Sequence, residues 1–198
     1  MAGNANSGHA SNWKYGIKHQ SILEDYDNQI ELDDNDFNSL YRFYVLNAPY
    51  PKHSFQGRSF PDYGWTGSIS QNGLGKALDS ALSENSGLFY LPGKDTGVKL
   101  ASLFQQAGLH DGLLSDIDRE RAAITLNTKK GTNNYLRLFR HVRNCFAHGR
   151  FILVSTELNP DGVFVMEDRD SYNITARIVL RKRTLLDWSL VVSAGPNV

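Results

Sequence analysis

The chain has 198 residues, of which 40% are hydrophobic and 21% charged, and its formal net charge is zero. This length and composition are typical of one globular domain, and they exclude a collagen, a coiled coil and a wholly disordered chain. No run approaches the roughly 20 apolar residues that a membrane span needs, and the polar start lacks the apolar core of a secretory signal. The single cysteine, Cys145, cannot form an internal disulfide. We therefore expect a cytoplasmic protein with no membrane partner.

Charged residues are distributed unevenly along this neutral chain. Residues 24–36 contain seven acidic residues and no lysine or arginine, whereas residues 121–156 contain seven lysines or arginines and no acidic residue. A local positive surface attracts phosphate groups even when the whole protein is neutral. Either the two runs are ordinary solvated faces, or the basic run forms a nucleic-acid site that the acidic run could cover.

Residues 1–35 are predicted to form a polar arm, and residues 36–198 a single domain whose apolar residues recur mostly at helical spacing. Asp34 and Asn35 can begin the first helix, because their side chains accept hydrogen bonds from free backbone N–H groups. Residues 50–71 and 87–97 are predicted to be connections. In chain order, the predicted helices cover about residues 35–47, 74–82, 97–107, 116–126, 133–148 and 185–191.

Local signals mark the ends of several of these helices. Thr96 and Thr132 can cap the third and fifth helices. The pattern Ser115-x-x-Asp118 resembles a capping box and is expected to open the fourth helix. Gly149 can end the fifth helix in the left-handed conformation.

Extended runs follow the fifth helix. Residues 151–156 and 163–166 are rich in β-branched and apolar side chains, and they flank the turn sequence NPDG at residues 159–162. They predict a β-hairpin near residues 151–168, to which residues 174–180 could add a strand. We therefore expect a mainly α fold, a helical bundle with a β-hairpin inserted late.

The fifth predicted helix carries the residues best suited to chemistry. Asn144 and His148 are four residues apart and share a helix face, and the long side chain of Arg143 can reach the same place. Histidine moves protons near neutral pH, and arginine binds phosphate oxygens through a planar fork of donors. Asparagine can orient the imidazole. Since RNA carries its own nucleophile, the 2′-OH, these groups would suffice to cleave it without a metal or cofactor.

The segment RNCFAHGR, residues 143–150, resembles the signature of HEPN domains, in which arginine and a following asparagine precede a histidine at a helix end. The resemblance implies a HEPN-like helical bundle and a metal-independent endoribonuclease, such as a toxin or defence effector, which leaves a 2′,3′-cyclic phosphate. Arg143, Asn144 and His148 match the catalytic motif. The resemblance also implies a homodimer in which two copies of the motif face each other, and an antitoxin or other protein partner. Three further residues are expected to bind RNA: Arg137, Arg140 and Arg150.

Other interpretations of the same residues remain open. Arg143 and His148 could be structural, the first in an ion pair and the second against the helix dipole. His141, Cys145 and His148 are possible metal ligands, but the two histidines lie about 10 Å apart along the helix axis, too far to share one ion. A HEPN-like module could also bind RNA, a nucleotide or a protein without catalysis.

Overall fold

A five-stranded mixed sheet forms the centre of the molecule. The computed structural model describes residues 20–23, 26–50, 58–69, 72–92, 98–110, 112, 114, 116–126, 134–170 and 173–196. The strands run in the order β1-β2-β5-β4-β3, with β1 parallel to β2 and every other neighbouring pair antiparallel. Their bounds are β1 Gly87–Pro92, β2 Arg121–Leu126, β3 Phe151–Val154, β4 Val163–Asp170 and β5 Asn173–Arg181.

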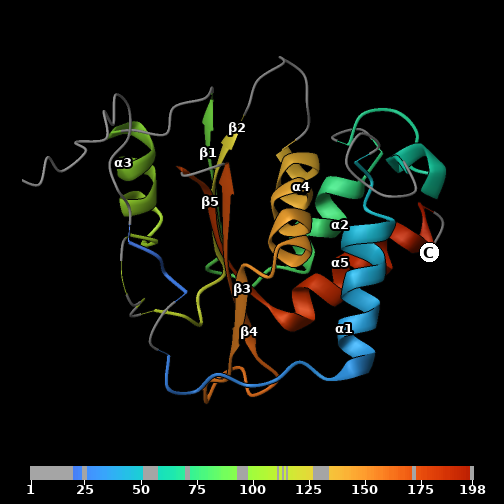
Figure 1. The fold of residues 1–198 in the computed structure, drawn as a ribbon. Coiled ribbons are helices and arrows are strands. Elements are labelled where there is room, and N and C mark those ends of the chain that lie inside the picture. The colour runs from blue at the N-terminus through green and yellow to red at the C-terminus, as the bar shows by residue number, and fades with distance from the viewer. Residues whose placement is uncertain are drawn as a thin grey trace, which may run out of the picture.

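Helices cover both faces of this sheet, but unequally (Figure 1). Helix α3 lies on one face, and α1, α2, α4 and α5 lie on the other. Two short turns, the π-helical η1 and the 3-10 helix η2, belong to the thicker layer. The bounds are α1 Asp34–Tyr41, η1 Arg42–Leu46, η2 Phe60–Tyr63, α2 Leu74–Ser80, α3 Val98–Gln106, α4 Asn134–Ala147 and α5 Lys182–Ala194.

The predicted fold class, a mainly α HEPN-like helical bundle with a late hairpin, is therefore wrong. The hairpin of β3 and β4 is not an insertion, because β4 pairs with β5 and β5 continues the sheet to β2 and β1. Two segments account for the error: one was predicted as a helix and the other as a connection, and both are strands.

The segment predicted as the fourth helix is strand β2. Ala122, Ala123 and Ile124 are at most 1% exposed, and the strand is paired on both edges, with β1 and with β5. Asp118, which suggested a capping box, accepts hydrogen bonds from the side chains of Thr156 and Asn159 instead. Its carboxylate therefore stabilises the turn after β3, while the other capping position, Ser115, lies outside the described residues.

The segment predicted as the connection 87–97 contains β1. Gly87 and Pro92 suggested a loop, but they are the two ends of an edge strand, where proline is tolerated because an edge N–H needs no partner. The residues after Pro92, including the predicted cap Thr96, lie outside the described residues, as does the cap Thr132.

The other predicted elements are confirmed. The first helix is present, but its cap is Asp33 rather than the predicted Asp34 or Asn35. The Asp33 carboxylate accepts from the N–H groups of Asn35 and Asp36, and the helix ends at η1 before Pro49. The predicted helices near residues 74–82, 97–107, 133–148 and 185–191 correspond to α2, α3, α4 and α5, and the extended runs to β3, β4 and β5. The spacing of apolar residues thus identified these elements correctly.

Two neighbouring carboxylates in β4 point to opposite faces of the sheet, as successive side chains of a strand must. On the α3 face, Glu167 Oε2 lies 3.4 Å from Nε of Arg177, with both side chains fully buried. The Arg177 guanidinium also stacks over the ring of Phe104 in α3 and donates to the Leu109 carbonyl oxygen at 2.8 Å. On the opposite face, Asp168 contacts α4.

The described part of the acidic run lies beside β3 and α5. Gln29 forms an antiparallel bridge with Val154, the last residue of β3. Asp36 and Asp33 lie 2.6 and 3.7 Å from Nζ of Lys182, at the start of α5. These carboxylates therefore neutralise a lysine of α5.

Burial of β2 gives a stability test. We expect Ile124→Ala to lower the free energy of unfolding by about 2–5 kcal/mol, because Ile124 is fully buried and truncation leaves a cavity. Leu158→Ala is the control, since Leu158 is 79% exposed, and it should change stability by less than about 0.5 kcal/mol. Urea unfolding of the two variants measures the difference, and equal losses would contradict the placement of β2.

Candidate functional site

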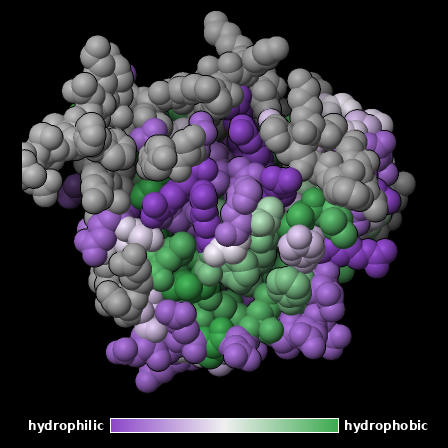
Figure 2. Space-filling view, viewed as in Figure 1, coloured by the Kyte–Doolittle hydropathy of each residue, from purple (hydrophilic) through white to green (hydrophobic). Residues whose placement is uncertain are grey.

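Helix α4 presents an apolar side to the core and a basic side away from it. Leu138, Phe139, Val142 and Cys145 are fully buried in the core between the helices and the sheet. In the view of Figure 2, hydrophilic side chains gather in the upper middle of the molecule, toward α4, and an apolar area lies below them. The burial of the apolar stripe therefore fixes which side chains α4 offers to a ligand.

The end of α4 leaves His148 in solvent. The helical pattern continues as far as the His148 N–H, which donates to the Asn144 carbonyl oxygen at 3.0 Å. Gly149 then takes a left-handed conformation with φ of 60°, and the Arg150 N–H donates back to the Cys145 carbonyl oxygen at 2.9 Å. This glycine turn ends the helix as predicted. His148 is exposed one helical turn beyond Asn144.

Four polar side chains form a hydrogen-bonded relay from the sheet to the side of α4. His141 Nδ1 lies 2.7 Å from Oδ2 of Asp168. The same Oδ2 accepts from Asn144 Nδ2 at 3.0 Å, and Asn144 Oδ1 accepts from Arg143 Nη1 at 3.0 Å. Both ends of the Asn144 amide are therefore engaged, so its orientation is fixed. Asn144 therefore positions Arg143, whereas the sequence suggested that Asn144 would orient His148.

His141 is held on both sides and is nearly inaccessible. It is 6% exposed, and its Nε2 lies 3.3 Å from the backbone oxygen of Thr125 in β2. A carboxylate and a carbonyl only accept, so the protonated imidazole, with two N–H groups, satisfies both contacts. His141 therefore joins α4 to β4 and β2, and it does not face solvent as an exchangeable acid or base.

The relay keeps Asp168 ionised. Burial alone would raise the pKa of this carboxyl, but the hydrogen bond and charge of His141, with donors from Asn144 and the Arg169 N–H, together hold the pKa below its ordinary value of 3.8. A persistent negative charge at Asp168 is what orders the two α4 side chains around it.

The predicted RNA-binding arginines occupy different environments. Arg140 is half-buried and lies over the ring of Tyr50, 5.9 Å from its centre. Arg150 donates to the backbone oxygen of Arg169 at 3.2 Å. Arg137 is only 7% exposed, so the surface of α4 presents Arg140 and Arg143 rather than Arg137. Within the described part of the chain, no carboxylate lies within ion-pair distance of Arg140, Arg143 or Arg150.

The possible metal ligands on α4 are not grouped around a common point. Cys145 is fully buried, and burial raises the pKa of its thiol well above the usual value, which disfavours the thiolate that metals bind. His141 is occupied by Asp168 and Thr125. In the described ranges, no three His, Cys, Asp or Glu side chains form a group that could hold a metal ion.

Two members of the relay, His141 and Asp168, were absent from the predicted site. The signal for His141 was present, because it precedes Asn144 by three residues and so shares its helix face. Asp168 had a weaker signal: it follows the apolar run of β4, where an ionisable side chain is buried only if it is paired. Their meeting depends on the packing of α4 against β4, which the sequence does not reveal.

Comparison of the chain with protein-family models, with curated proteins and with solved structures finds no match. In the described residues, no helix combines the length and apolar character required to cross a membrane.

The relay gives a second stability test. We expect Asp168→Asn to lower the free energy of unfolding at neutral pH by about 3 kcal/mol, because it leaves His141 buried without its counter-charge. The control is Asp170→Asn, two residues along the same strand, which removes an exposed carboxylate and should cost less than about 0.5 kcal/mol.

The same pair of proteins gives a pH test. A carboxyl whose pKa is lowered by folding contributes stability above its unfolded pKa and loses it as the pH falls through the folded value. The stability difference between wild type and Asp168→Asn should therefore be full above pH 3.8 and shrink below it. Chemical unfolding across this range measures the difference, and a constant value would show that Asp168 is not the ionised partner.

Proposed function

We propose that the basic side of α4 binds single-stranded RNA and cleaves it without a metal ion. One observation carries the proposal: the Arg143 guanidinium is fixed by Asn144, without a carboxylate partner in the described structure, and the same helix ends in the exposed His148. The fold differs from the bundle that the HEPN resemblance implied, so the proposal rests on these side chains and not on the architecture.

Arg143 is suited to bind the phosphate. An arginine held by a neutral amide keeps its full charge available, and one edge of its fork is already oriented by the bond from Nη1 to Asn144 Oδ1. Because Asn144 is anchored by the ionised Asp168, the Arg143 guanidinium loses little conformational entropy when it binds a phosphate. Arg140 and Arg150 add positive charge nearby on α4 and just after it.

His148 is suited to transfer the protons. RNA cleavage requires removal of the 2′-OH proton, attack of that oxygen on phosphorus, and protonation of the leaving 5′-oxygen. Histidine can serve both proton steps near neutral pH, and His148 is exposed to solvent and substrate. The products are a 2′,3′-cyclic phosphate and a 5′-OH, and Arg143 stabilises the charged phosphorane between them.

A second copy of the chain would complete the site. One α4 supplies one exposed histidine, whereas removal and delivery of the two protons are most readily divided between two. We therefore propose a homodimer in which two α4 ends face one RNA strand. The proposed setting is the cytoplasm, as a toxin or defence effector held in check by an antitoxin or another protein.

A module that binds RNA without cleaving it is the second candidate. It is favoured by the contacts of His148: no described side chain hydrogen-bonds to its imidazole, whereas catalytic histidines are commonly oriented by a neighbour. In this case Arg143→Ala would weaken RNA binding, and no His148 variant would change a rate.

The decisive measurement is cleavage of single-stranded RNA by the purified chain in EDTA. We expect His148→Ala to lower the cleavage rate by at least ~100-fold, because it removes the acid–base group. Arg143→Ala should lower it by a similar ~100-fold through lost stabilisation of the phosphorane. Product ends are identified by their 2′,3′-cyclic phosphate.

Matched controls separate chemistry from folding. His110→Ala removes another exposed histidine, and Arg183→Ala removes an exposed arginine that pairs with Asp187. Both should cleave at the wild-type rate. An inert wild type, or a His148→Ala protein as active as wild type, would refute the ribonuclease proposal.

A further inference from the structure

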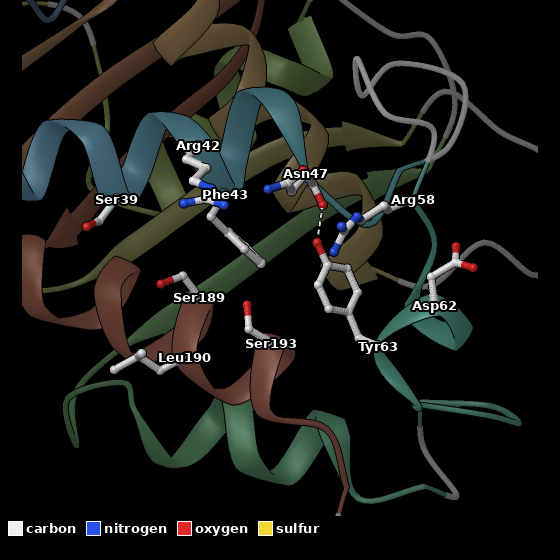
Figure 3. Close-up of a pocket in the computed structure, with 10 residues that line it drawn as sticks. All are labelled: Ser39, Arg42, Phe43, Asn47, Arg58, Asp62, Tyr63, Ser189, Leu190 and Ser193. Atoms are coloured by element: carbon white, nitrogen blue, oxygen red, sulfur yellow. Dashed lines mark hydrogen bonds between the residues drawn. The ribbon is translucent and has the colours of Figure 1, made fainter.

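A polar cavity lies on the outer side of the thicker helical layer, away from the basic side of α4. Its volume is about 500 Å³, within the range of small-molecule sites, and it is formed by α1, η1, η2 and α5. Figure 3 shows side chains from these elements around the cavity. None of its lining residues belongs to α4, so it is a separate site from the one described above.

Two guanidinium groups give the cavity a positive charge. Arg42 comes from η1, and Arg58 lies just before η2 with its guanidinium 5.5 Å from the centre of the Tyr63 ring. Neither has an ion-pair partner within the described structure. The only lining carboxylate, Asp62, accepts from both the N–H and the hydroxyl of Ser59 at 2.7 Å. Arg42 is therefore available to an anion, and Arg58 keeps its charge beside the cavity while its side chain also interacts with Tyr63 and with the charge of Asp62.

Three serine hydroxyl groups also line the cavity. Ser39 comes from α1, and Ser189 and Ser193 come from successive turns of α5. Ser189 donates its proton to the Leu186 carbonyl oxygen at 2.7 Å, which leaves its oxygen as an acceptor. Such a surface can exchange hydrogen bonds with a ligand that itself carries several hydroxyl groups.

Asn47 adds an unsatisfied acceptor to this surface. Its side-chain oxygen is buried, and it has no hydrogen-bond partner within the described residues. Most buried polar atoms have a partner, and Asn47 is a lining residue of a cavity in which a ligand hydroxyl could supply one. A fully ionised phosphate offers no donor, whereas a hydroxyl does.

Aromatic rings provide an apolar side. Phe43 and Tyr63 line the cavity with their ring centres 6.3 Å apart. Tyr63 is fixed in place because its hydroxyl donates to the backbone oxygen of Asn47, as the dashed line in Figure 3 shows. Tyr63 is half-buried, so part of its ring can contact the C–H surface of a sugar, whereas Phe43 is only 6% exposed and belongs to the core.

We propose that this cavity binds a small phosphorylated sugar. The phosphate pairs with Arg42 and Arg58, the sugar hydroxyls bond to the serines and to Asn47, and the sugar carbons lie against the exposed part of Tyr63. Phosphate beside hydroxyl groups also occurs in RNA, but an open hollow of about 500 Å³ matches the size of a free sugar phosphate better than that of a polymer strand. The inference does not depend on the ribonuclease proposal, because the two sites share no residue.

Calorimetric titration of the full chain tests this assignment, with glucose 6-phosphate as the probe and glucose and inorganic phosphate as separate titrants. The sugar phosphate should bind at least ~10-fold more tightly than either fragment. The double variant Arg42→Gln, Arg58→Gln should lose at least ~10-fold in affinity, since it removes both charges. Ser193→Asp should have the same effect, because it sets a negative charge opposite the phosphate.

The controls decide between this ligand and its alternatives. The variants should keep the wild-type melting temperature, because every substituted side chain is exposed: Arg42, Arg58, Ser193 and the control position Arg183. Arg183→Gln should bind glucose 6-phosphate as wild type does. Absence of saturable binding, equal binding of inorganic phosphate, undiminished affinity of the double variant, or displacement of the sugar phosphate by single-stranded RNA would each overturn the proposal.

Discussion

Two adjacent carboxylates in β4 hold the charged groups that connect the sheet to its two helical layers: Asp168 bonds to α4 directly, and Glu167 pairs with Arg177 of β5, which stacks on Phe104 of α3. Glu167 pairs with Arg177 beneath α3, and Asp168 pairs with His141 of α4, so that each face is fixed by a buried charge. Removing one partner of such a pair lowers the free energy of unfolding by far more than the intact pair contributes to it, because the remaining charge is buried without a partner. The alternation of side chains along a strand thus determines where α4 lies, and the position of α4 determines which side chains reach solvent.

The sequence predicted those elements whose structure depends on local pattern and missed those that depend on distant pairing. The stripe of α4 and the turn before β4 are local signals, and both were read correctly. Residues 121–126 contain arginine, alanine and leucine, which favour a helix in isolation, yet they form β2 because β1 and β5 lie on either side. Asp118 was wrongly predicted to belong to a helix capping box for the same reason, since its hydrogen-bond partners lie some 40 residues away, in the turn after β3.

The candidate site likewise contains residues that were predicted from local spacing and residues that only tertiary packing brings to it. Arg143, Asn144 and His148 were predicted from their spacing on one helix, but the spacing could not reveal what holds them. The structure adds Asp168 from β4 and turns Asn144 into the support of Arg143. The helical motif identifies the groups that can contact a ligand, whereas the rigidity of those groups comes from a residue of β4.

The order of strands in the sheet also bears on how the chain folds. β3, β4 and β5 are consecutive and join through short connections, so they can pair early at little cost in chain entropy. β2 must pair with β5 across α4 and both strands of the hairpin, and such distant contacts form slowly. Until β2 pairs, one edge of β5 is open, with Ala176, Ile178 and Val179 along it. That edge is the place where a folding chain is most exposed to pairing with another molecule.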